Sequence, residues 1–418
     1  MVTVNDFADR PSVSGINEDH SEYKVRGQEA ISLKFVSDEA SMATAAEYHP
    51  EFVHQHFGDS ETIFGYKNLK VTLYYSDQSM YIYPEITDDG SIKEEFPEFD
   101  PDDVLTKLKQ QLPNWQMDAM VASLDEFKYR LNEQSSAVEM PEGEQIGHFR
   151  TNGKEFDVFK VFQCSDQFDK LVTRTQTLAL WYIDAADYTD NSDVRFNYFF
   201  LYEVVEKPVT KEKIYKVAGY AVYCNFHAYL ENIRPRVAQI LLLPPYRKSG
   251  NGAKFLQAIY NDLITVPKVI DITAEDPADA FIYLRDFVDC SNCRKLAEWA
   301  PDNLKTGFTD EMRDVARNKL KIHPKQAERV YEILRYMNVD ATDAEELKNY
   351  RAQVMKRLER PMKRQQSDWN KIQNNLKSEE ASVVAQSAQN QAATLEQMYK
   401  RTLNDYNVVI QRLKTHSP

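Results

Sequence analysis

The segment from Arg234 to Asp286 constrains the fold more than any other part of the chain. Gln239–Leu243 is a largely apolar run of strand length, and Pro244-Pro245 ends it. A basic loop, Tyr246–Ala253, follows, and apolar residues then recur at helical spacing as Phe255, Leu256, Ile259, Tyr260 and Leu263. The pattern predicts a strand, a glycine loop and a helix in direct succession.

This order of elements is typical of an anion site. The loop holds Gly250 and Gly252, two of only 12 glycines in 418 residues. Such a loop presents backbone N–H groups at the N-terminus of the helix, where the helix dipole also favours negative charge. A second short strand, Val269–Thr273, then delivers Glu275 and Asp276, and a helix follows. Together these features predict an enzyme that uses a phosphate-bearing cofactor.

Length and composition predict a globular protein of two or three domains. Hydrophobic residues make up 42% of the 418 residues and aromatic residues 12%, enough for a sizeable core. The formal net charge of −14 disfavours free nucleic acid as the main partner. The charge fits a basic partner and simple solubility equally well.

The cysteines and the N-terminus predict a soluble intracellular protein. Four cysteines do not form a disulfide framework in a chain of this length. Cys290 and Cys293 form a C-x-x-C pair without a second pair or a nearby histidine cluster, so two structural helix thiols are favoured over a metal or redox site. The polar N-terminus has no signal-peptide pattern, and no apolar stretch approaches membrane-spanning length.

Changes in patterning predict four regions. These are a disordered leader (1–28), an N-terminal domain (29–140), a catalytic domain (141–300) and a C-terminal helical region (301–418). Within them the sequence predicts a hairpin of Thr62–Tyr75 with Met80–Ile86, and helix over 101–134. Further strands are expected at Val158–Phe162, Ala179–Ile183, Phe196–Val205 and Val217–Phe226. The fold class is α/β (α+β), a mixed sheet flanked by helices.

The last 70 or so residues form a different pattern. They hold little Gly or Pro and predict two long helices, Asp343–Asn375 and Val383–Lys414. Six basic residues cluster on the first of them: Arg351, Lys356, Arg357, Arg360, Lys363 and Arg364. A solvated helical face is the favoured interpretation, with a docking surface as the alternative.

Two nucleotide-binding motifs do not fit the glycine loop. A dinucleotide fingerprint needs a third glycine where Phe255 stands, and a Walker loop needs Gly-Lys-Ser/Thr where the chain has Gly252-Ala253-Lys254-Phe255. Arg247–Ala253 instead resembles the Arg/Gln-x-x-Gly-x-Gly/Ala loop of the GNAT superfamily of N-acetyltransferases. In that superfamily the loop N–H groups hold the pyrophosphate of acetyl-CoA.

Other segments resemble the type B histone acetyltransferase catalytic subunits. The resemblance runs from about residue 30 to residue 415 and rests on several motifs. They are Phe57-Gly58-Asp59 with Glu61-Thr62, Phe64–Lys67, Arg234–Val237, Asp271–Pro277 and Arg329–Arg335. This family resemblance implies a GNAT fold and histone lysine acetylation from acetyl-CoA, with no metal.

The resemblance also implies roles for individual residues. Glu275 matches the general base, and Asp276 and Asp184 match assisting acids, although the family usually has glutamate at the position of Asp184. The implied acetyl-CoA contacts are Ile240, Leu241 and Leu242 along the pantetheine arm, and Arg247, Lys248, Ser249, Gly250, Asn251, Gly252 and Ala253 around the pyrophosphate. The implied contacts with the histone H4 tail are Asp59, Ser60, Glu61, Cys224, Asn225 and Phe226, with Cys224 in place of an aromatic residue.

The chemistry of lysine acetylation explains why a carboxylate such as Glu275 is needed as a general base. A lysine amine has a pKa near 10.4, so it is almost wholly protonated at neutral pH and must lose a proton before it can attack. A carboxylate at a strand end can accept that proton directly or through water. The alternative for Glu275-Asp276-Pro277 is a helix N-terminal cap. No cysteine lies in the loop or beside Glu275, which disfavours a ping-pong reaction through a thiol.

The chemistry predicts direct acetyl transfer to lysine, and the family resemblance implies newly synthesised histone H4 as the substrate. The alternatives are a GNAT enzyme for another protein or amine, and a non-catalytic histone-binding scaffold. The family resemblance further implies a WD40-repeat histone-binding subunit as partner, a location in cytoplasm and nucleus, and no direct contact with nucleic acid or membrane.

Overall fold

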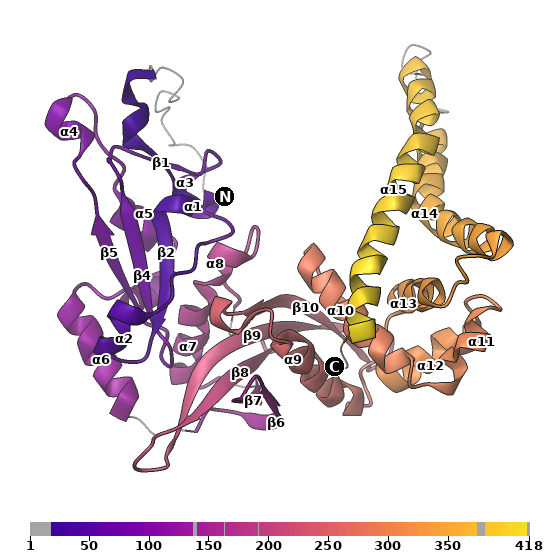
Figure 1. Cartoon of the computed structure of the whole chain (residues 1–418), viewed down its shortest axis with the longest axis horizontal. Helices are drawn as coiled ribbons and strands as arrows, with labels where there is room; N and C mark the ends of the chain where they lie inside the picture. Colours follow the sequence, from indigo (N-terminus) through magenta and orange to yellow (C-terminus); the bar gives the residue numbers. More distant parts are fainter. Residues whose placement is uncertain (1–17, 137–139, 163, 191, 374–380, 416–418) are drawn as a thin grey trace. The chain divides into compact units, whose positions relative to one another are not determined.

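The computed structural model describes residues 18–136, 140–162, 164–190, 192–373 and 381–415, with only the backbone given for 18–19, 365–373 and 381–392 (Figure 1). The chain divides into two compact units. The first contains Met1–Val222 and Gln239–Tyr246, and the second contains Tyr223–Ala238 and Arg247–Pro418. The predicted boundaries of the domains at 29–140, 141–300 and 301–418 stay a prediction.

A three-stranded sheet forms one part of the first unit. Its order is β2-β4-β5, from Ile31–Val36, Lys70–Ser76 and Ile82–Thr87. β2 is parallel to β4, whereas β4 and β5 are antiparallel, which confirms the predicted hairpin for these two strands. The start of the predicted first arm is separate, because β3 (Thr62–Phe64) pairs with β1 (Lys24–Arg26) in a two-stranded sheet.

The predicted disordered leader is wrong for residues 18–28. This stretch carries the 3-10 helix η1 (Glu18–Tyr23), strand β1 and the start of α1 (Gly27–Ala30). Tyr23 is completely buried, and its carbonyl accepts a hydrogen bond from the N–H of Gly65 at 2.8 Å. One buried aromatic and pairing with a strand about 40 residues away order this segment, and neither produces a local periodicity. Residues 1–17 lie outside the described residues.

The helices of the first unit are mostly short. After α1 they are α2 (Glu39–Thr44), α3 (His54–Phe57), α4 (Ile92–Glu95), α5 (Val104–Gln110), η2 (Asn114–Ala119), α6 (Leu124–Ser136), α7 (Asp166–Gln176), α8 (Ala179–Tyr182) and η3 (Pro244–Tyr246). α5, η2 and α6 confirm the helical content expected over 101–134. The strand expected at Ala179–Ile183 is wrong, because this segment is helix α8. All four residues of α8 are buried, and a short apolar run does not distinguish a buried strand from a buried helical turn.

A six-stranded sheet contributes strands to both units. Its order is β11-β10-β9-β8-β7-β6, from Thr273–Ala274, Ile233–Leu242, Lys213–His227, Phe196–Glu206, Lys154–Val161 and Glu144–Thr151. β6, β7 and β8 are antiparallel, whereas β10 and β11 are parallel. The strands expected at 158–162, 196–205 and 217–226 are confirmed as β7, β8 and β9. A mixed sheet with flanking helices confirms the predicted α/β (α+β) class.

The second unit is mainly helical. Its helices are α9 (Asn251–Thr265), α10 (Asp279–Cys293), η4 (Ala297–Trp299), α11 (Pro301–Leu304), α12 (Asp310–Leu320), α13 (Pro324–Met337), α14 (Ala344–Gln373) and α15 (Ala381–Thr415). Pro301 and Pro324 occupy the first helical position of α11 and α13, where proline is tolerated. Cys290 and Cys293 are free, buried thiols within α10, in agreement with the predicted helix pair.

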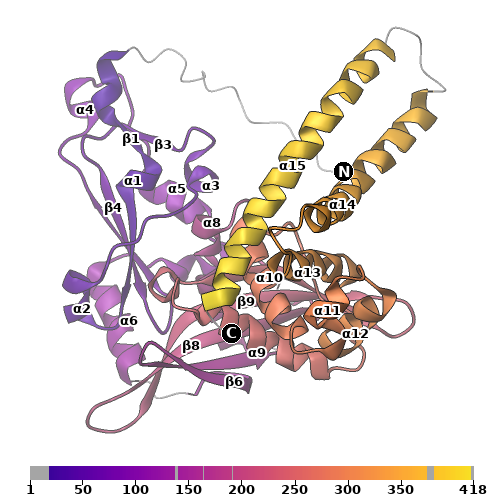
Figure 2. The same ribbon diagram turned by 45° about the vertical axis from the view of Figure 1, so that its right-hand side comes forward.

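The two long C-terminal helices confirm the prediction for this region, and they lie side by side in both views (Figures 1 and 2). The basic residues of α14 do not form a purely solvated face. Arg357 donates through Nε to the buried carboxylate of Glu332 at 2.7 Å, and Arg360 forms an ion pair with Glu328 at 2.8 Å. Two of the six basic residues therefore pair with acids of α13, while all of the six except Arg357 are exposed, as expected of a solvated face.

No helix among the described residues is both long enough and apolar enough to cross a membrane.

Candidate active site

The glycine loop folds as the start of helix α9. Gly250 precedes the helix in the left-handed conformation, with φ +85° and ψ −7°. Nothing lies within 4 Å of a Cβ built on Gly250, so the backbone conformation, rather than crowding, favours glycine here. Lys248 also has a positive φ of 60°. The chain thus turns sharply between Tyr246 and the first turn of α9.

The first turn of α9 offers backbone donors. Its first intrahelical hydrogen bonds run from the N–H groups of Ala253 and Lys254 to the carbonyl of Gly250, at 3.1 and 3.4 Å. The N–H groups of Asn251 and Gly252 precede these bonds. A helix N-terminus of this kind stabilises an anion, and Arg247 and Lys248 add positive charge. The residues fit the pyrophosphate of acetyl-CoA, the cosubstrate that the sequence predicts.

Strand β10 precedes this loop, and its pairing with β11 ends early. β11 pairs with β10 only at Arg236 with Thr273 and at Val237 with Ala274. Ile240–Leu242 therefore lie beyond the reach of this two-residue strand. Ile240 and Leu242 are half-buried, whereas Leu241 is buried. This is the segment that the family resemblance assigns to the pantetheine arm.

Glu275 follows β11 directly. Its backbone N–H donates to the carbonyl of Val237 at 3.1 Å, which fixes the main chain beside β10. The carboxylate is open to solvent, with its side chain 56% exposed, and its Oε1 lies 3.7 Å from a guanidinium nitrogen of Arg236. A fixed backbone with an open carboxylate suits a group that must exchange a proton with a substrate.

The segment before Glu275 is anchored by a buried ion pair. Asp271 is fully buried, and Arg234 donates to its two carboxylate oxygens at 2.5 and 3.1 Å. Bidentate pairs of this type fix orientation as well as position. The pair ties the start of β10 to the chain that leads into β11, and thereby positions Glu275.

The alternative of a helix cap at Glu275-Asp276-Pro277 is wrong. The N-cap residue of α10 is Ala278, and no side chain caps this helix. Asp276 is exposed and has a positive φ of 30°, a conformation that aspartate tolerates better than most residues. Both carboxylates are therefore free of any capping role.

The predicted tail-binding residues of the second unit lie at the end of β9. Cys224 is buried at 7% exposure, whereas Asn225 and Phe226 are half-buried. The guanidinium of Arg236 stacks over the ring of Phe226 at 4.1 Å from its centre. Arg236 therefore contacts both the predicted base and a predicted substrate residue. The sequence motif contained Arg236, but no role was predicted for it.

The first unit brings two other predicted residues together around His54. Its Nε2 lies 3.3 Å from Oδ1 of Asp184, and its Nδ1 lies 3.7 Å from Oε1 of Glu61. The Asp184 side chain is 71% exposed, whereas that of Glu61 is 31% exposed. Asp59 and Ser60 are exposed on the turn just before Glu61. No sequence pattern pointed to His54, since the two histidines of this one-turn helix carry no signal that distinguishes one of them.

Glu61 is held in place by its backbone. It has a φ of +50°, its N–H donates to the carbonyl of Gly58 at 2.9 Å, and its carbonyl accepts from Gly27 at 2.8 Å. Within the first unit the structure thus joins Asp184 to Glu61. Within the second unit it joins Glu275 to Phe226 through Arg236.

Among the described residues, no group of three or more His, Cys, Asp or Glu side chains could hold a metal ion.

Known proteins resemble this chain over almost all of its length. A family model described as "Histone acetyl transferase HAT1 N-terminus" matches residues 23–184, and one described as "Histone acetyltransferase type B catalytic subunit, C-terminal" matches residues 285–336. Proteins named histone acetyltransferase type B catalytic subunit are similar in Mus musculus (32% identity over 411 residues) and Homo sapiens (32% over 409), each with 96% of both chains covered. The protein of that name from Pyricularia oryzae is 29% identical over 354 residues, with 74% of both chains covered.

The predicted family is confirmed by these matches, since two relatives are 32% identical to the chain with 96% of both chains covered. The chain belongs to the family of type B histone acetyltransferase catalytic subunits.

Proposed function

We propose that this protein transfers the acetyl group of acetyl-CoA to lysine side chains on the N-terminal tail of newly synthesised histone H4, with Glu275 as the general base. The observation that carries the proposal is the setting of Glu275. Its carboxylate is solvent-open on a main chain fixed to β10, in the same unit as a loop that suits pyrophosphate. Family membership supplies the acetyl transfer.

The proposed reaction is a direct attack without an acyl-enzyme. Glu275 accepts one proton from the protonated lysine, directly or through a water molecule. The neutral amine attacks the thioester carbonyl, the C–N bond forms and the C–S bond breaks. The second proton of the nitrogen leaves as the amide forms, and the thiolate of CoA takes up a proton. The buried thiols Cys290 and Cys293 support this route, because burial raises their pKa values well above the ordinary value and keeps them unreactive.

The acidic groups of the first unit support a basic substrate. Asp59, Glu61 and Asp184 lie on two segments joined by His54, and the exposed members can attract a lysine-rich tail. The net charge of −14 acts in the same direction. The preference for histone H4 rests on the family resemblance of these segments.

We also infer the partner and the location from this resemblance. A WD40-repeat histone-binding subunit would present the histone, and the enzyme would work in cytoplasm and nucleus on histone that has not yet been deposited. Co-purification of the native protein, followed by mass spectrometry, tests the partner. Imaging of a tagged full-length chain tests the location.

One experiment tests the activity and its alternatives together. The full chain is incubated with labelled acetyl-CoA and each core histone separately, and the labelled sites are mapped. We expect label on lysines of the H4 tail, and loss of label with the Glu275→Gln variant. Label on another histone or on a small amine would reject the H4 proposal, and acetyl-CoA binding without any transfer would indicate a scaffold.

A further inference from the structure

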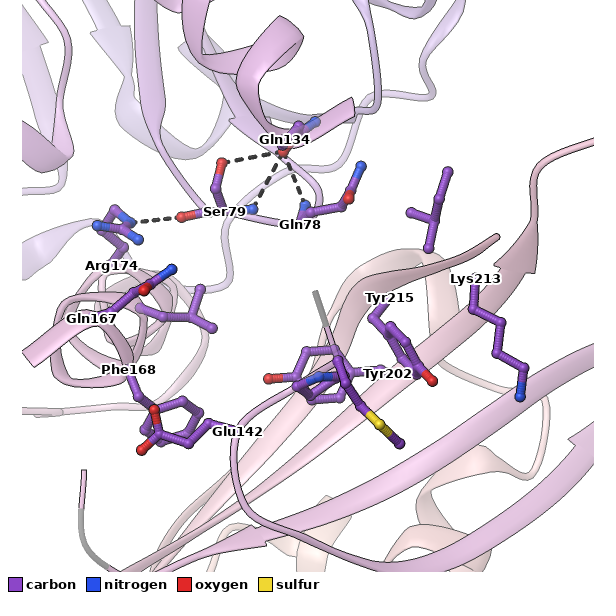
Figure 3. A pocket seen from close by; sticks show the side chains of 14 residues that line it. Gln78, Ser79, Gln134, Glu142, Gln167, Phe168, Arg174, Tyr202, Lys213 and Tyr215 are labelled. Carbon is purple, nitrogen blue, oxygen red and sulfur yellow. Dashed lines mark hydrogen bonds between the residues drawn. The ribbon is translucent and has the colours of Figure 1, made fainter. Parts of the chain in front are cut away.

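A cavity of about 280 Å³ lies within the first unit and contains none of the residues of the candidate active site. Its walls come from the β4–β5 turn, the end of α6, helix α7, strand β8 and the start of β9 (Figure 3). Its volume is near the lower end of the range of about 300–1,000 Å³ that is typical of small-molecule sites. The cavity is therefore large enough for a small organic ligand.

One wall of the cavity contains a buried arginine without an acidic partner. Arg174 is only 6% exposed, and its Nε donates to the carbonyl of Ser79 at 2.6 Å. Its guanidinium also lies 4.2 Å from the centre of the Tyr81 ring. Among the described residues, no carboxylate comes within 4.0 Å of this guanidinium, and no atom accepts a hydrogen bond from its two amino groups.

The surroundings of Arg174 do not compensate its charge. Burial lowers the pKa of Arg174 and the charge of Arg130 acts in the same direction, whereas Tyr81 and Asp118 oppose this only in part. A buried charge is normally paired, because removing it from water is costly. The environment of Arg174 would be completed by a negative group in the cavity.

Tyr202 provides a second unpartnered polar group. Its side chain is 3% exposed and packs edge-on against Tyr215, with ring centres 6.2 Å apart. Burial raises the pKa of Tyr202, so its hydroxyl stays protonated. Within the described part of the chain this hydroxyl makes no hydrogen bond. Figure 3 shows Arg174 beside Ser79 at one side of the cavity, with Tyr202 and Tyr215 at another.

Part of the remaining polar wall is already satisfied. Oε1 of Gln134 accepts hydrogen bonds from the N–H groups of Gln78 and Ser79, both at 3.3 Å, and from the Ser79 hydroxyl at 3.1 Å. Glu142 is the single acid among the lining residues, and Ser165 donates to it through its N–H at 2.9 Å and through its hydroxyl. This part of the wall is thus preorganised. Among the described lining residues, donors also remain on Lys213 and Tyr215, but only Arg174 and Tyr202 carry unused donors on buried side chains.

We propose that the cavity binds a small organic carboxylate with a flat apolar body and a second polar group. The carboxylate would face Arg174, since a guanidinium fork matches its two oxygens. The body would pack between Leu171 and the ring of Tyr215, and the second polar group would accept from the Tyr202 hydroxyl. A phosphate is disfavoured, because its higher charge would be repelled by Glu142, the single acid of the lining.

Four matched probes test the proposal by calorimetry on the full chain. They are 4-hydroxyphenylacetate, its neutral amide, phenylacetate without the hydroxyl, and 4-hydroxybenzylphosphonate. We expect saturable binding of the hydroxylated acid together with a rise in Tm. The amide and the phosphonate should each bind at least tenfold more weakly.

Variants locate the binding within the cavity. Arg174→Met should weaken the binding of 4-hydroxyphenylacetate and of phenylacetate at least tenfold. Tyr202→Phe removes only the hydroxyl. It should lower the affinity for 4-hydroxyphenylacetate several-fold and leave the affinity for phenylacetate unchanged. Arg130→Met is the matched control, because Arg130 also lies over the Tyr81 ring but pairs with Glu133 and does not line the cavity.

Four results overturn the proposal. They are no saturable binding of 4-hydroxyphenylacetate up to about 10 mM, where even a millimolar site would be mostly filled; equal affinity for acid and amide; tighter binding of the phosphonate; and affinity unaffected by Tyr202→Phe. If Arg174→Met does not fold, the comparison of acid with amide on the unaltered protein and the Tyr202→Phe variant decide the question. None of these measurements depends on acetyl transfer.

Discussion

Nε2 of His54 lies 3.3 Å from Oδ1 of Asp184, and this contact joins residues 130 positions apart in the chain. The other nitrogen of the same ring lies 3.7 Å from Glu61. His54 thereby orders two carboxylates that the sequence assigns to different tasks, one to catalysis and one to substrate binding.

Replacing His54 should weaken the binding of the histone substrate more than the binding of acetyl-CoA. In His54→Gln the two carboxylates lose their shared partner, so we expect the KM for an H4 tail peptide to rise several-fold while the KM for acetyl-CoA holds. Steady-state kinetics with each substrate varied in turn gives both values. His148→Gln is the control. His148 lies on the edge strand β6, and it also contacts a carboxylate, since its Nδ1 lies 2.7 Å from Oδ1 of Asp157. Equal effects of the two variants would show that His54 has only a structural role.

Glu275→Gln should lower kcat by on the order of 10²–10⁴, the usual effect of losing a general base. The substitution keeps the shape of the side chain, so the affinity for acetyl-CoA should barely change. The rate should recover in part as pH rises, since more of the substrate amine is then neutral. Glu345→Gln, at an acid whose side chain is 71% exposed on α14, should behave as the unaltered enzyme. A Glu275→Gln variant with normal kcat at pH 7 would place the base elsewhere.

The loop can be tested by a pair of glycine substitutions. Gly250 has a φ of +85° and Gly307 a φ of +105°, and nothing lies within 4 Å of a Cβ built on either residue. Alanine at each position should therefore cost a similar conformational strain, about 1–2 kcal/mol. Only Gly250→Ala should raise the acetyl-CoA Kd, because only that residue shapes the turn into α9. Calorimetry with acetyl-CoA and thermal unfolding of both variants makes the comparison, and equal Kd values would exclude the loop from the cofactor site.

The acids of the first unit should set the salt dependence of substrate binding. Asp59→Asn combined with Glu61→Gln removes two negative charges, and we expect a several-fold higher KM for the H4 peptide with a smaller dependence on salt. Glu94→Gln combined with Glu98→Gln removes the same charge from exposed positions of the same unit. A salt titration of KM on all three proteins separates a local effect from net charge. If KM depended on salt equally in both double variants, the effect would come from net charge alone and not from the positions of Asp59 and Glu61.

His56 should make the protein less stable in acid. Its ring stacks on Trp181 with centres 3.8 Å apart, and burial lowers the pKa of His56 to about 3. The unfolded chain takes up a proton near pH 6.5 and the folded chain does not, so stability falls as pH drops from about 6.5 toward 3. At pH 5 the loss from this residue is about 2 kcal/mol. Urea unfolding gives the free energy of unfolding at pH 7 and at pH 5. Between these pH values it should fall by about 2 kcal/mol less in His56→Phe than in the unaltered protein. An equal fall in both proteins would contradict the burial of a neutral His56 ring.

Local patterns predicted the parts of the site that local chemistry determines. β10, the loop and α9 form one continuous segment, and the apolar spacing and glycines that define them are adjacent in sequence. Glu275 followed from the same segment. His54 could not be predicted, because its partners are 7 and 130 residues away and only the tertiary fold brings them together.

The errors in the predicted fold also arise from tertiary contacts that no local pattern contains. Helix α8 is buried on all sides, so its sequence lacks the polar face that would reveal its period. The stretch around Tyr23 is ordered by β3, whose position no local pattern contains. Arg357 of α14 was taken for part of a solvated face because its acidic partner, Glu332, belongs to another helix.

The pairing of Arg357 with Glu332 makes the C-terminal helices part of the core of the second unit. Glu332 is 3% exposed, and it also accepts from the Tyr406 hydroxyl at 2.6 Å. A shortened chain that ends before α14 would lose both partners of this carboxylate together with the helices that pack on α10 and α13, and would expose the apolar surface of those two helices to water. Trimming the protein to its transferase motifs would thus remove an internal support of those motifs, and a useful minimal enzyme has to keep almost the full length of the chain.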